Sequence, residues 1–140
     1  MKTAKTGFTL FEILLIFALS ASITAFGAIS LARLQALFQV RSAADEIKSR
    51  VQYGRDLAIA NKDAQSYSLT LVGSSVKFLS SGQTISQYQV PVGIVMAPTS
   101  LTWSFTPTTG AIASCTTCTL DLSFRGVTES IIVQANGLVN

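Results

Sequence analysis

The segment that decides the fold runs from Lys5 to Leu34 and reads KTGFTLFEILLIFALSASITAFGAISLARL. Within it, residues 13–32 contain no Asp, Glu, Lys or Arg. As a helix with a rise of about 1.5 Å per residue, this run is about 30 Å long, which is the thickness of the hydrocarbon core of a bilayer. The sequence therefore predicts a membrane-spanning helix close to the N-terminus.

Two interpretations of this N-terminus compete, because a short basic stretch before an apolar run also describes a secretory signal peptide. The apolar run is longer than the roughly 7–15 residues that are typical of a signal peptide. An acid, Glu12, stands where a signal peptide is purely apolar, and a helical pattern without proline continues from Ser30 to Asn61. We therefore expect the segment to be retained as part of the folded protein.

The residues from Lys5 to Glu12, KTGFTLFE, resemble the prepilin leader and cleavage site of type IV pilins and type II secretion pseudopilins. The resemblance implies that a prepilin peptidase cuts between Gly7 and Phe8, removes residues 1–7 as a leader, and methylates the new amine of Phe8. It also implies that residues 8–33 form the transmembrane and assembly helix of the mature chain.

Glu12 has a specific role in this resemblance. A carboxylate inside a membrane helix costs several kcal/mol unless it is paired. The resemblance implies that Glu12 pairs with the N-terminal amine of a neighbouring subunit and so directs assembly. The alternative is that Glu12 lies among the lipid headgroups and is simply hydrated.

The chain after the apolar run continues as an amphipathic helix. Apolar residues recur at alternating spacings of three and four, which places them on one helix face: Leu37, Val40, Ala44, Ile47, Val51, Gly54 and Ala58. A helix from Phe8 to about Asn61 is roughly 80 Å long, more than one domain core can cover. We therefore expect an α+β, lollipop-shaped pilin fold, in which residues 34–61 pack on an antiparallel β-sheet head.

Residues 65–140 have the alternating pattern of β-strands, and residues 34–140 together should form a periplasmic head. The strands are expected at 67–71, 76–78, 84–90, 101–105, 119–124 and 130–135, the first two as a hairpin. Pro91, Pro98 and Pro107 lie between them, where proline is tolerated. Trp103 and Phe105 are expected in the core rather than on a ligand platform.

The residues needed for common catalytic sites are missing from the sequence. The chain has no histidine and two cysteines, Cys115 and Cys118. Ser-His and Cys-His nucleophiles are therefore excluded, and a structural zinc would lack ligands. The Cys-Thr-Thr-Cys stretch lies between expected strands, so we interpret it as a small disulfide formed in the periplasm, with free thiols as the alternative. We expect no catalytic residue, no cofactor and no metal.

The net charge of +3 does not indicate a nucleic-acid partner. From Asp63 onward, Lys77 and Arg125 are balanced by Asp63, Asp121 and Glu129. This part of the chain therefore lacks the basic patch that phosphate backbones require. Lys2 and Lys5 precede the apolar run, which sets that end in the cytoplasm.

Two further stretches resemble the H-type minor pseudopilin (GspH/FimT) group: Gly54 to Asn61, GRDLAIAN, and residues 131–139, IIVQANGLV. The resemblances imply a structural subunit, a minor pilin or pseudopilin, held in the bacterial inner membrane by one span. It would then enter a type IV pilus or a type II secretion pseudopilus. The implied partners are the prepilin peptidase, other pilin or pseudopilin subunits, inner-membrane lipid and the assembly platform. The alternatives are a pilus-tip binding module (an adhesin or DNA-uptake receptor) and a signal-anchored periplasmic domain.

Overall fold

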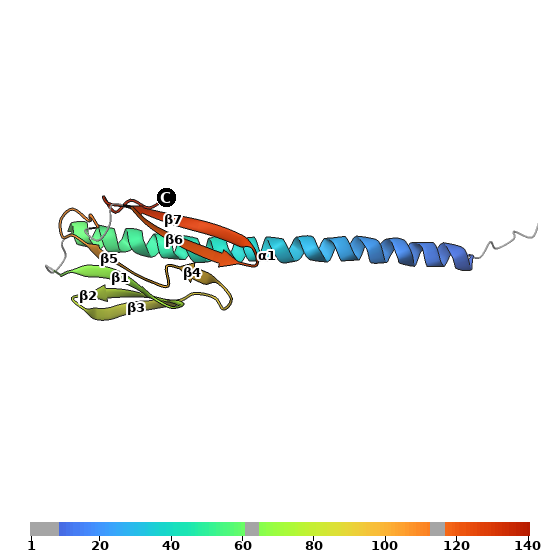
Figure 1. The fold of residues 1–140 in the computed structure, drawn as a ribbon, viewed down its shortest axis with the longest axis horizontal. Helices are drawn as coiled ribbons and strands as arrows, with labels where there is room; N and C mark the ends of the chain where they lie inside the picture. The colour runs from blue at the N-terminus through green and yellow to red at the C-terminus, as the bar shows by residue number, and fades with distance from the viewer. Residues whose placement is uncertain (1–8, 61–64, 113–116) are drawn as a thin grey trace, which may run out of the picture. The chain divides into compact units, whose positions relative to one another are not determined.

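The computed structural model describes residues 9–60, 65–112 and 117–140 of the 140-residue chain, and only the backbone of residues 25–29 and 117. Gly7, Phe8 and Cys115 therefore lie outside the described residues. The elements are α1 (Leu10–Ala60), β1 (Tyr67–Val72), β2 (Ser75–Ser80), β3 (Gln83–Gln89), β4 (Val95–Ala97), β5 (Ser100–Phe105), β6 (Thr117–Phe124) and β7 (Val127–Gln134) (Figure 1). The chain divides into two compact units, Met1–Gln35 and Ala36–Asn140.

The first unit contains the N-terminal part of α1. Thr9 precedes the helix, and its carbonyl oxygen accepts hydrogen bonds from the backbone N–H groups of Glu12 at 3.1 Å and Ile13 at 3.3 Å. Every side chain from Leu10 to Thr24 is exposed. Within the described ranges, no helix is both long and apolar enough to qualify as a membrane span. The span expected over residues 13–32 stays a prediction.

The second unit combines the C-terminal part of α1 with two antiparallel sheets, so the α+β class is confirmed. The strand order is β3-β2-β1-β5 in the larger sheet and β4-β6-β7 in the smaller one. Register places Leu69 of β1 between Phe78 of β2 and Trp103 of β5. In the smaller sheet, Leu120 of β6 faces Ile131 of β7. All five side chains are buried and face the core.

The apolar helix face predicted from the sequence packs against these sheets (Figure 1). Leu37 is half-buried, and the other members of the stripe are buried: Val40, Ala44, Ile47, Val51, Gly54 and Ala58. Trp103 is 0 % and Phe105 3 % exposed, which confirms their place in the core. The buried helix face and the inward faces of both sheets thus form one hydrophobic core.

Gly54 allows the helix to approach the larger sheet closely. A Cβ atom at this position would lie 2.6 Å from the ring of Phe105 and 2.9 Å from the ring of Phe78. Any larger residue would have to displace these rings, so the glycine fits a packing requirement. The isolated glycine in the helical pattern of the sequence therefore marks a point of close helix–sheet contact.

The strand predictions were largely confirmed, with two differences. The sequence led us to expect one mainly antiparallel sheet, whereas the structure contains two. The three-residue strand β4 was not predicted, because its residues, Val-Met-Ala, are all apolar and too few to show an alternation of polar and apolar side chains. Its partner is β6, which lies more than twenty residues further along the chain. Such long-range pairing leaves no local signal in the sequence.

Candidate functional site

The structure describes only part of the predicted N-terminal motif. Gly7 and Phe8 are outside the described residues, so cleavage between them and methylation of Phe8 stay predictions. Glu12 lies in the first turn of α1 and is exposed. Its backbone N–H also donates to Oγ1 of Thr9 at 3.3 Å. Thr9 is therefore the N-cap of α1.

The sequence reasoning missed that Thr9 and Glu12 have the spacing of a capping box. In that motif a Ser or Thr is followed three residues later by Glu or Gln, and each side chain supports the other's backbone N–H. The pattern was readable in the sequence as Thr-Leu-Phe-Glu. The positive end of the helix dipole favours a carboxylate in this first turn. Glu12 therefore has a local role in starting the helix as well as the assembly role implied by the resemblance.

The carboxylate of Glu12 has no partner of opposite charge within the described part of the chain. The ion pairs there join Arg50 to Glu46 and Arg55 to Asp56. The helix after Glu12 likewise has no apolar partner. The large apolar side chains between Leu10 and Ile23 are all at least 45 % exposed: Leu10, Phe11, Ile13, Leu14, Leu15, Ile16, Phe17, Leu19 and Ile23. A helix that is apolar all round is normally buried in protein or lipid.

The hydroxyl groups in this stretch are satisfied within the helix itself. Ser20 donates to the carbonyl of Ile16 at 2.7 Å, and Thr24 donates to the carbonyl of Ser20 at 2.7 Å. Ser22 makes the same bond to Ala18 at 2.9 Å. Hydroxyls bonded in this way add no unpaired donor, which is the condition for placing them in an apolar medium. The three hydroxyls therefore add no unpaired donor to the exposed helix surface.

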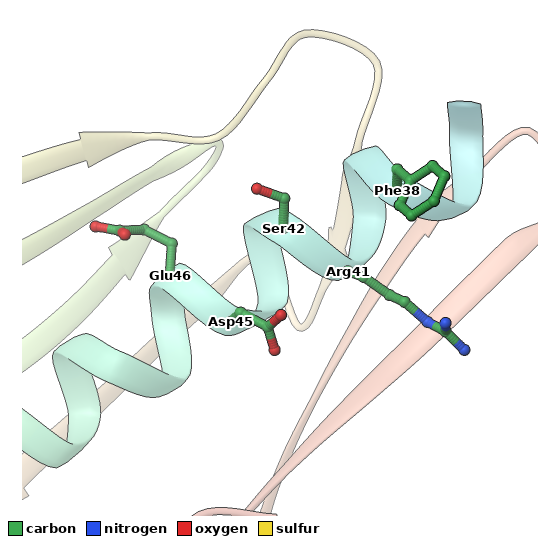
Figure 2. Close-up of a pocket in the computed structure, with 5 residues that line it drawn as sticks. All are labelled: Phe38, Arg41, Ser42, Asp45 and Glu46. Atoms are coloured by element: carbon green, nitrogen blue, oxygen red, sulfur yellow. The ribbon is translucent and has the colours of Figure 1, made fainter. Parts of the chain in front are cut away.

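A shallow hollow of about 560 Å³ lies on the second unit, lined by Phe38, Arg41, Ser42, Asp45 and Glu46. All five residues come from successive turns of α1 (Figure 2). Their polar groups point in different directions and do not converge on one point. Ligand sites require a few convergent polar groups in a concave pocket. The hollow is therefore an open surface feature, and its arrangement does not suit a small molecule.

A polar cluster connects α1 to the edge strand β3. Arg50 Nε donates to Glu46 Oε1 at 2.8 Å, and Arg50 Nη1 donates to Ser86 Oγ at 3.1 Å. The guanidinium carbon also lies 5.3 Å from the ring centroid of Tyr88. Glu46 and Arg50 are four residues apart in sequence, so this ion pair joins successive turns of α1. The cluster fixes β3 against the helix.

Burial raises the pKa of the Tyr88 phenol above its ordinary value of 10.0; Glu46 adds to the shift and Arg50 opposes it. The fold therefore favours the neutral phenol. The stabilising contribution is complete below about pH 10 and is lost as the pH rises through the higher folded-state pKa. We expect Tyr88→Phe to lose less stability than the wild type between about pH 9 and 11, as measured by urea unfolding. If the free energies of unfolding of the two proteins fell equally with pH over this range, the raised pKa of Tyr88 would be contradicted.

The predicted disulfide is only half described. Cys118 lies in β6, is 5 % exposed, and faces Val133 of β7 in the antiparallel register. Cys115 is outside the described residues, so the Cys115–Cys118 pairing stays a prediction. Within the described ranges, no group of three or more His, Cys, Asp or Glu side chains is arranged to hold a metal ion.

The first turn of α1 and the exposed apolar surface that follows it are thus the strongest candidate for a functional site. Glu12 supplies the charge, and residues 10–24 supply an apolar helix without a partner in the described chain. No family model, no curated protein and no solved structure matches this chain.

Proposed function

We propose that this protein is a structural subunit of a bacterial type IV pilus or type II secretion pseudopilus, a minor pilin or pseudopilin. One observation carries the proposal: the apolar part of α1 exposes nine large side chains between Leu10 and Ile23. Leaving so much apolar surface in water would forgo more than about 10 kcal/mol. In this proposal the helix is inserted in lipid first and packs against the helices of other subunits later.

In the proposed function, the precursor is held in the inner membrane by residues 8–33, with the head of residues 34–140 in the periplasm. This is the lollipop arrangement of pilins. The prepilin peptidase cuts between Gly7 and Phe8, and the new amine of Phe8 is methylated. The assembly platform then moves the subunit from lipid into a filament, where neighbouring helices replace the lipid. No step of this cycle requires an enzymatic site or a cofactor in the chain itself.

The Glu12 carboxylate gives the assembly its axial register. In a medium of low dielectric constant, an unpaired carboxylate and an unpaired amine are both costly, and pairing them removes most of that cost. A neighbouring subunit offset by the correct axial distance presents its N-terminal amine to Glu12. The lack of an ion pair for Glu12 within the described chain supports this role.

Membrane residence can be tested by fractionation of cells that express the full chain. The protein should stay in the membrane pellet after an alkaline carbonate wash, with its head accessible to protease only from the periplasmic side. Leu19→Lys places a charge near the middle of residues 8–33, which costs about 2.5–3.5 kcal/mol, and should release much of the protein. Gln52→Lys, on an exposed helix position of the head, is the matched control. Release of the wild type by carbonate would contradict the proposal.

A further inference from the structure

Two apolar side chains of the head, one in the connection between β3 and β4 and one at the start of β4, are exposed. Val92, in the connection between β3 and β4, is 99 % exposed, and Val95 is 61 % exposed. The connection is closed by a hydrogen bond from the N–H of Ile94 to the carbonyl of Pro91 at 3.2 Å. Ile94 is only 6 % exposed, so it anchors the turn in the core. The turn is therefore anchored through Ile94, and the side chain of Val92 extends into the solvent.

The hairpin between β6 and β7 supports this loop. A Cβ atom on Gly93 would lie 2.7 Å from the ring of Phe124, so the loop backbone rests directly on that ring. Arg125 follows in the hairpin, with its guanidinium 5.1 Å from the centroid of the same ring. The ring of Phe124 thus lies against both the backbone next to the exposed Val92 and the guanidinium of the exposed Arg125.

The loop and the hairpin lie at the end of the second unit where its helix begins (Figure 1). Phe38 and Arg41 lie on the first turns of that helix (Figure 2). Phe38 is 63 % exposed, and Arg41 is exposed. We call the exposed set at this end of the unit the head tip: Phe38, Arg41, Val92, Val95 and Arg125.

The chain length places the head tip close to the proposed membrane span. The apolar run ends at Ala32, and Ala36 is the first residue buried in the second unit. They are four positions apart in the chain, so the distance between them is at most about 14 Å. The polar headgroup layer of each leaflet adds several Å beyond the hydrocarbon core. A head tethered so closely to the span is within reach of the headgroups.

We propose that the head tip rests on the bilayer before assembly, with Val92 in the interfacial layer and Arg41 and Arg125 against anionic lipid headgroups. This inference rests on the proposed membrane span. Neither guanidinium has an ion pair in the described structure. Asp45, one turn from Arg41, offsets part of the charge, while Glu46 is already paired with Arg50. Basic residues beside apolar ones are the composition that binds an anionic lipid surface.

A second copy of the chain is the competing occupant of the head tip. Lipid is favoured because the short length of chain after the proposed span keeps the head tip within reach of the headgroups. The two occupants differ in a measurable way. Contact with lipid depends on headgroup charge, and contact with a second copy depends on protein density in the membrane.

The test uses the full chain reconstituted in vesicles that contain phosphatidylglycerol and lipids brominated near the top of the acyl chains. Three tryptophan variants report position by fluorescence quenching: Val92→Trp at the tip, Phe17→Trp in the proposed span, and Leu138→Trp as the matched control. Leu138 is 49 % exposed and follows Gly137, which contacts Arg55, nineteen residues beyond Ala36 in α1. The native Trp103 is 0 % exposed and common to all three.

We expect bromolipid to quench Val92→Trp at least about threefold more than Leu138→Trp, because only the tip reaches the interface. The difference should shrink in zwitterionic vesicles, and also in the double variant Val92→Trp, Arg125→Glu. Quenching of Phe17→Trp without quenching of Val92→Trp would overturn this inference and leave the proposed span standing. Loss of quenching at Phe17→Trp would overturn both. Dependence of the Val92→Trp signal on protein density at constant lipid composition would assign the tip to a second copy.

Discussion

Glu12→Gln leaves the start of α1 intact but reduces incorporation of the subunit into filaments by at least about tenfold. Glutamine can replace glutamate in a capping box, so the helix start with Thr9 is retained. The substitution removes the negative charge, which in the proposed function pairs with the amine of a neighbouring subunit. The measurement compares the sheared filament fraction with the membrane fraction in cells that carry the assembly system.

Two further variants separate charge from helix capping. Thr9→Ala removes the cap and costs about 1 kcal/mol of local helix stability, but it leaves the charge in place. It should therefore assemble nearly as well as the wild type. Glu12→Asp keeps the charge on a shorter side chain and should recover part of the assembly. If Glu12→Gln assembled normally while Thr9→Ala did not, Glu12 would act through the helix start alone.

Gly137→Ala is expected to destabilise the head by about 2–5 kcal/mol. Gly137 has a φ of +78°, which an L residue adopts at a cost. A Cβ at this position would also overlap the carbonyl oxygen of Gly110 and lie 2.9 Å from Cδ of Arg55. Arg55 in turn donates to the carbonyl of Asn136 at 3.2 Å. The substitution therefore disturbs the contacts that Asn136 and Gly137 make with Arg55 of α1.

Gly126 provides a matched control for Gly137, because it has the same φ of +78° and a Cβ added to it would have no neighbouring atom within 4 Å. Gly126→Ala should cost only about 1–2 kcal/mol, the free energy that an L residue needs to adopt this backbone conformation. Thermal unfolding should therefore give a drop in Tm for Gly137→Ala that exceeds that for Gly126→Ala by roughly 4 °C or more. Equal decreases in Tm would show that the overlap between the added Cβ atom and the carbonyl oxygen of Gly110 is relieved without loss of stability.

The elements of the fold could be predicted from local patterns, and their arrangement could not. The stripe that includes Val40, Ile47 and Val51 predicted the buried helix face, and the alternation around Leu69 and Leu71 predicted β1. Separation into two sheets depends on pairings such as Val95 with Ser123, between residues distant in sequence. Those pairings are selected by how the whole core packs, which no single window of sequence contains.

The candidate site was predicted unevenly for a similar reason. Glu12 stood out because one acid beside a long apolar run is costly, and this is visible in the sequence. The capping role of Thr9 was equally readable but was overlooked. The head tip could not be predicted, because Val92 and Arg125 are adjacent only after β4 and the β6–β7 hairpin have formed. A valine in a loop between Pro91 and Gly93 has no distinctive local pattern.

The most direct test of the proposed function is the intact mass of the membrane-extracted protein, with and without a co-expressed prepilin peptidase. With the peptidase, the mass should match a chain that begins at Phe8 and carries one added methyl group. Without it, the mass should match the full precursor, and Gly7→Ala should retain that mass even when the peptidase is present. A chain that still begins at Met1 beside active peptidase, or one cut beyond the apolar run, would contradict the proposal and leave an anchored or secreted β domain.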